Sequence, residues 1–181
     1  MADVNQLISD FYRVAQERDF ARDFQFRVLS INAADSGVTF DNDDLVYIRT
    51  ATLPERAIQN KTVPYMGLNF NVPGSVLYPN SEAYAVEFYA DAQSKIRQKF
   101  EDWSRSTFDD ANSTGNYFTP KQSSTIDLVQ LDAKLTKVAQ YQLVGVSVRN
   151  VGPLAYNIAD GTGETLKFTA TLAYHYWKRL P

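Results

Sequence analysis

The chain has 181 residues, 44% hydrophobic and 13% aromatic, which is enough for one ordinary core. Eighteen Lys and Arg against 21 Asp and Glu give a formal charge of -3, so no surplus of positive charge favours tight binding of DNA or RNA. The absence of cysteine excludes disulfide scaffolds, Cys-ligated metal sites and thiol enzymes, and the single histidine excludes a multi-histidine metal site in one chain. We therefore expect one domain over residues 1–181.

The segment that opens the chain lacks the basic flank and the apolar run of a secretory signal, so we expect the protein to fold where it is made. The longest uncharged stretch, 20 residues between Lys61 and Glu82, contains three prolines and is not a membrane-spanning helix. No membrane association is predicted.

Apolar residues recur every three or four positions from Val4 to Ala15, which predicts an N-terminal helix over residues 1–18 with Asp3 as its cap. The apolar stripe of this helix is expected to lie on another surface. From Phe24 the period becomes two, with Phe24, Phe26 and Val28 on one face of a half-buried strand.

Most of the remaining chain is predicted as strand. The expected strands cover residues 24–34, 38–40, 45–52, 58–63, 68–72, 84–89, 126–131, 137–149 and 164–177. The last two are unusually long, and the turn residues between them favour an antiparallel pair.

A second helix is predicted after Asp91, its expected cap. It places four apolar residues on one face and adds an exposed pair between Glu101 and Arg105. The shared face consists of Ala92, Ile96, Phe100 and Trp103.

Two segments are predicted to have little regular structure. Residues 54–80 are rich in proline and asparagine and are interrupted only by the two short strands 58–63 and 68–72, and a connection of this length usually serves binding or assembly. Residues 108–124 are rich in small polar residues and form an expected solvated loop.

No motif predicts catalysis, a cofactor or a metal. His175 has no nucleophile or carboxylate in a recognisable pattern nearby. The acidic run from Asp41 to Asp44 has Val46 where a calcium loop needs glycine, so we expect a polar turn. Gly161 and Gly163 lack the third glycine of a dinucleotide motif. The tyrosines and phenylalanines lack the basic groove of a single-strand-binding platform.

Four segments in order resemble the tail tube protein of contractile-tailed, myovirus-type bacteriophages. They are residues 18–28 (RDFARDFQFRV), 50–74 (TATLPERAIQNKTVPYMGLNFNVPG), 95–103 (KIRQKFEDW) and 167–178 (KFTATLAYHYWK). The first helix and the polar loop 108–124 extend beyond the family pattern, either as surface elaborations or as marks of a baseplate-proximal relative.

The resemblance implies a mainly β fold, a sandwich or barrel with one flanking α-helix and an N-terminal helix. It also implies hexameric rings whose sheets join into one continuous β-cylinder. The rings stack into the conduit for DNA ejection, with no catalysis, in a virion tail assembled in the host cytoplasm. Sheath, baseplate and tail terminator proteins are the implied partners, and DNA passes without specific binding.

Loop 54–80 is the expected stacking contact, with Pro54, Tyr65, Met66, Leu68 and Phe70 as interface candidates. Alternatively, the apolar residues of the loop fold back onto their own subunit. Three other functions stay open: the tube or tube initiator of a phage-related secretion or injection apparatus, more remotely a monomeric ligand-binding β-barrel, and last a hydrolase that uses paired carboxylates.

Overall fold

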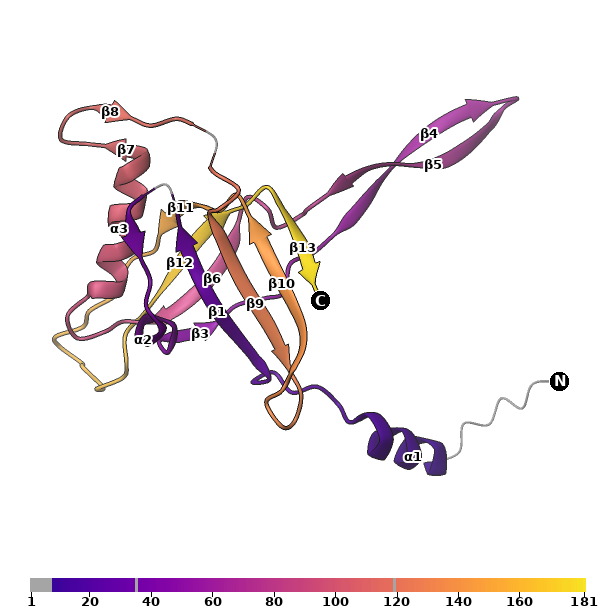
Figure 1. Cartoon of the computed structure of the whole chain (residues 1–181), viewed down its shortest axis with the longest axis horizontal. Helices are drawn as coiled ribbons and strands as arrows, with labels where there is room; N and C mark the ends of the chain where they lie inside the picture. Colours follow the sequence, from indigo (N-terminus) through magenta and orange to yellow (C-terminus); the bar gives the residue numbers. More distant parts are fainter. Residues whose placement is uncertain (1–7, 35, 119) are drawn as a thin grey trace.

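The computed structural model describes residues 8–34, 36–118 and 120–181 as two antiparallel sheets with helices at their sides (Figure 1). The first sheet has the order β13 (Tyr176–Leu180), β10 (Lys137–Val144), β9 (Thr125–Leu131), β1 (Phe26–Ala33) and β2 (Val38–Thr39). The second has the order β11 (Ser147–Val151), β12 (Lys167–Ala173), β6 (Tyr84–Tyr89) and β3 (Ile48–Thr50). Both sheets stay open within the described residues, so the fold is the sandwich rather than the closed barrel.

Three helices and two separate hairpins complete the described chain. The helices are α1 (Ile8–Arg18), α2 (Asn42–Leu45) and α3 (Lys95–Thr107). One hairpin joins β4 (Ala57–Tyr65) to β5 (Leu68–Leu77), and a small one joins β7 (Phe108–Asp109) to β8 (Thr114–Gly115). The polar loop 108–124 thus contains a short hairpin.

The apolar residues of the alternating strands point into the core, as the sequence predicts. Tyr84, Val86 and Phe88 of β6 are buried, and so are their partners on β12. Residues of both sheets and of α3 form one apolar cluster, in which the Phe88 and Phe168 rings stack with centroids 5.5 Å apart. The predicted helix face is confirmed for Ile96, Phe100 and Trp103, while Ala92 lies before the helix.

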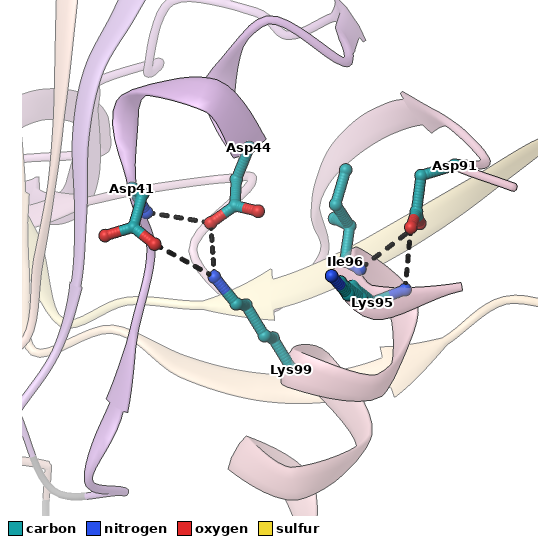
Figure 2. Close-up of polar contacts among 6 residues, drawn as sticks. All are labelled: Asp41, Asp44, Asp91, Lys95, Ile96 and Lys99. Atoms are coloured by element: carbon teal, nitrogen blue, oxygen red, sulfur yellow. Dashed lines mark hydrogen bonds and ion pairs between the residues drawn. The ribbon is translucent and has the colours of Figure 1, made fainter. Parts of the chain in front are cut away.

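Helix α3 contacts the edge strands β11 and β2 and covers one side of the sandwich. The N-cap position is Ser94, whose side chain makes no capping bond. The predicted residue, Asp91, lies just before it and satisfies the first turn, because its carboxylate accepts the backbone N–H groups of Lys95 (2.9 Å) and Ile96 (3.3 Å) (Figure 2). The predicted Glu101–Arg105 pair is wrong. Glu101 pairs instead with Arg97, four residues earlier, and Arg105 pairs with Asp102, three residues earlier.

The acidic run is a helix rather than a plain turn, and the strand predicted from Leu45 begins only at Ile48. Asp41 N donates to Asp44 Oδ2 at 2.7 Å, which closes the first turn of α2. Lys99 Nζ of α3 lies 2.5 Å from Asp44 Oδ2 and 3.6 Å from Asp41 Oδ2, so it ties α2 to α3 (Figure 2). Burial alone lowers the pKa of Lys99, but the two carboxylates raise it on balance.

The two long predicted strands do pair antiparallel, but each is broken once and changes sheet. The first breaks between β10 and β11 at Gly145, where φ is +70°. The second breaks between β12 and β13 at Tyr174 and His175. His175 N donates to Val144 O at 2.9 Å, so the two breaks lie side by side and form one corner of the sandwich.

The N-terminal part of β1 departs from prediction. Phe24 precedes the strand and is 71% exposed, whereas Val28 is buried as expected. Gln25 takes the buried place because its side-chain oxygen accepts Arg22 N at 2.6 Å and its carbonyl accepts Leu131 N at 2.9 Å. These bonds satisfy a buried amide that no apolar period reveals.

Helix α1 has no buried residue, so its apolar stripe is not covered by its own subunit, and the surface on which we expect the stripe to lie is not among the described residues. The helix projects from the sandwich below the start of β1 (Figure 1). Its expected cap, Asp3, lies outside the described residues.

Candidate assembly interface

The region 54–80 forms a long two-stranded arm that projects from the sandwich (Figure 1). Both strands are longer than the short strands predicted there, because the prolines do not end them. In a two-stranded arm both strands are edge strands, which tolerate proline, and Pro64 and Pro73 lie within the paired strands.

A two-residue turn closes the tip of the arm. Met66 and Gly67 have φ values of +48° and +78°, the pattern of a type I′ turn, whose right-handed twist matches that of the strands. This backbone suits glycine and asparagine but strains a methionine. The strained residue is also 85% exposed at the tip, which points to a role for its side chain rather than for its backbone.

The register makes the arm amphipathic. Directly opposed residues of an antiparallel pair point to the same side, so Tyr65 with Leu68 and Val63 with Phe70 share one face. Val72 continues this face opposite Lys61. We call Val63, Tyr65, Leu68, Phe70 and Val72 the apolar arm face.

The opposite side of the arm is polar. Asn69 lies opposite Pro64, and Thr62 lies opposite Asn71, to which its hydroxyl donates at 3.2 Å. The arm therefore presents one apolar and one polar side, although neither is covered within the described residues.

All the apolar interface candidates of the arm are exposed. The exposed fractions are 65% for Tyr65, 85% for Met66, 63% for Leu68 and 50% for Phe70. They do not fold back onto their own subunit, and contiguous exposed apolar patches are typical of interaction sites. Pro54 is not with them: it is half-buried at the base of the arm, before β4.

Sequence reasoning missed two members of the apolar arm face, Val63 and Val72. The signal was available, because Leu68, Phe70 and Val72 alternate and a two-residue turn at Met66 and Gly67 places Val63 and Tyr65 opposite them. Neither residue could be assigned while the register of the region was open.

The base of the arm is fixed to the sandwich by aromatic side chains. Trp177 Nε1 donates to the carbonyl of Glu55 at 3.0 Å, and Tyr84 donates its hydroxyl to the carbonyl of Thr52. Burial raises the pKa of Tyr84 far above its usual range. The ring of Tyr78, the residue after β5, lies edge-on to Tyr174 with centroids 6.4 Å apart.

Elsewhere the described residues hold no group of three or more His, Asp or Glu that could bind a metal. His175 is exposed at the sandwich corner, where its ring covers Gly145. In the part of the chain that the structure describes, no helix is long and apolar enough to cross a membrane.

No protein-family model matches the chain, and no curated protein matches it by sequence. Among solved structures, a chain of the six-fold symmetrised anti-feeding prophage (AFP) baseplate superposes with a TM-score of 0.60 at 15% identity. That match covers 89% of this chain and 95% of the other. The fold is that of contractile injection-system components.

Two further structures agree. A chain of the extracellular contractile injection system (PVC) sheath/tube terminator in the extended state has a TM-score of 0.59 at 10% identity, covering 90% of this chain and 97% of that one. A chain of the PVC sheath-tube complex has a TM-score of 0.52 at 10% identity, covering 97% and 99%. The resemblance to a contractile tail tube-type protein is confirmed at the level of fold.

Proposed function

We propose that this protein is a non-enzymatic structural subunit of the inner tube of a contractile tail-like machine, self-assembling into stacked hexameric rings. The observation that carries the proposal is the amphipathic arm, which projects from a sandwich of the injection-system fold with its apolar face uncovered. A fold does not by itself give a function, so the exposed arm is essential to the argument.

The open sandwich supports ring assembly. Strands β13 and β3 end their sheets without a neighbour among the described residues, and unpaired strand edges favour pairing with another chain. Sheets joined edge to edge around a ring form a cylinder wider than a single small barrel, and such a cylinder leaves an aqueous lumen.

The arm supports stacking of the rings. A head-to-tail contact that does not close on itself grows a filament. We place the apolar arm face and Met66 in this contact, against the adjacent ring, with Pro54 at the base of the arm that presents them. Sheath, baseplate and terminator proteins are the partners that such a tube requires.

Two cargoes fit the same tube. In a phage tail the lumen conducts DNA, and a protein with a charge of -3 gains little from counterion release and holds DNA weakly. The tube of a phage-related injection apparatus, or its baseplate-proximal initiator, is the second candidate, because the similar structures come from AFP and PVC assemblies. The gene neighbourhood separates the two candidates. Sheath and baseplate genes next to capsid genes would favour the phage tail, and the same genes next to genes for toxin-like cargo would favour the injection apparatus.

The arm can be tested with two matched variants. Met66→Asp with Leu68→Asp places charge on the tip and the apolar arm face, while Asn69→Asp with Asn71→Asp places the same charge on the polar side. Electron microscopy and sedimentation should show tubes for the control and unstacked rings for the first variant. Tubes of normal length from both would contradict the assignment of the arm.

A further inference from the structure

Helix α1 carries an apolar surface that its own subunit does not cover. Ile8, Phe11 and Val14 are exposed. The Phe11 ring contacts the rings of Phe20 and Tyr12, with centroids 5.8 Å and 6.0 Å apart, and both partners belong to the same N-terminal segment. A helix of 11 residues is marginal in water without tertiary packing. Its stability therefore requires a surface to pack against.

A matching groove lies on the same chain, between the start of β1 and the α2–β3 segment. It has a volume of about 690 Å³ and is lined by the apolar residues Phe24, Phe26, Leu45, Val46 and Ile48 together with the charged residues Asp23, Arg27, Asp43 and Arg49. Val46 is 80% exposed. We call this hollow the β1–α2 groove.

The linker between α1 and β1 holds the helix away from the groove of its own subunit. Gln25 N donates to Arg22 O at 3.1 Å, and Arg22 N donates to the Gln25 side chain at 2.6 Å, which closes a tight turn. Arg22 Nη1 also donates to Phe20 O at 3.1 Å. Because Gln25 is buried, this turn is anchored in the sandwich and directs α1 outward (Figure 1).

The charges of the two surfaces are compatible. Asp23 and Asp43, which line the groove, make no ion pair within the described residues, and neither does Arg18 in the last turn of α1. On the helix, Arg13 is flanked by Asp10 and Glu17, and Arg27 of the groove is also unpaired among the described side chains. A docked helix can therefore place basic groups against the groove carboxylates and acidic groups near Arg27.

We propose that α1 of one copy of this chain docks in the β1–α2 groove of a second copy. The contact joins two different surfaces, so it propagates around a ring or along a filament. The inference rests on the self-association in the proposed function, but it does not involve the arm. It gives the N-terminal helix a role as a clasp between subunits.

The cysteine-free chain allows a direct test by disulfide trapping. Phe11→Cys protein is mixed with Val46→Cys protein and oxidised, and Phe11→Cys is mixed in parallel with Ile158→Cys, a fully exposed site on another loop. Docking raises the local concentration of the first pair, so its mixed dimer should form at least about tenfold faster than that of the control pair. Adding Ile8→Asp to the Phe11→Cys chain should abolish the difference.

Equal trapping rates for the two pairs would overturn the inference. So would a double variant, Phe11→Cys with Val46→Cys, that closes its disulfide within one chain, because α1 would then reach its own groove. Tubes without preferential trapping would refute the clasp and leave the proposed function standing. Preferential trapping in a protein that forms only dimers would support the clasp and contradict the tube.

Discussion

The ring of His175 occupies the space beside Gly145, so that a Cβ added to Gly145 would lie 2.2 Å from His175 Nδ1. At this contact both long segments of the chain leave one sheet and enter the other. The corner lets one antiparallel pair supply strands to both layers of the sandwich.

Gly145→Ala is expected to lower the free energy of unfolding by about 1–2 kcal/mol for the left-handed backbone alone, and by more because of the clash with His175. Chemical denaturation measures the loss. Gly163→Ala is the control, because Gly163 has a φ of +76° with no atom near its Cβ position. Adding His175→Ala should recover only the part of the lost unfolding free energy that the clash causes. Equal losses for Gly145→Ala and Gly163→Ala would contradict the corner geometry.

Two tyrosines at the base of the arm should respond in opposite ways to loss of their hydroxyl. Tyr174 Oη is buried and has no hydrogen-bond partner within the described residues, so Tyr174→Phe should leave stability unchanged or raise it by about 1 kcal/mol. Tyr84→Phe removes the bond to Thr52 O and should cost about 1 kcal/mol. Thermal unfolding distinguishes them, and a destabilised Tyr174→Phe variant would reveal a partner for that hydroxyl.

Met66→Asn separates the backbone of the tip from its side chain. Asparagine tolerates the positive φ of a type I′ turn, so the variant should fold at least as stably as the parent. It also removes the exposed apolar side chain at the tip, so tubes should form only at a higher protein concentration than the parent requires. Unchanged assembly measured by sedimentation would exclude Met66 from the stacking contact.

The link between Lys99 and the α2 carboxylates should depend on pH. Because the folded-state pKa of Lys99 is raised, its contribution is fully present below the unfolded-state pKa and is lost as the pH rises through the folded-state value. Lys99→Met should cost about 1 kcal/mol near neutral pH, and progressively less as the pH rises through the raised folded-state pKa of Lys99. Denaturation of both proteins across this range measures the difference, and a constant difference would contradict the ion pair.

The elements that the sequence predicts well are those with one face buried along their whole length. Strand β6 and helix α3 bury one face each, so Val86 and Phe100 follow simple periods. The corner was missed because alternation from Leu166 to Tyr176 continues through a change of sheet, and only Gly145 marked the break. The alternation of apolar residues shows which side chains are buried, but the sheet that a strand joins is set by tertiary packing.

The arm was predicted in position but not in form. Pro64 and Pro73 argued against long strands, although two edge strands tolerate both. Exposure of the α1 stripe was also unpredictable, because exposed and buried apolar residues with the same spacing look alike in a sequence.

The central claim is that the chain assembles by itself into a hollow tube. Negative-stain electron microscopy of the untagged protein over a range of concentrations, with sedimentation alongside, tests it most directly. Six-fold rings or hollow tubes with a central channel are the predicted result. A monomer at every concentration, with its arms uncovered, would contradict self-assembly.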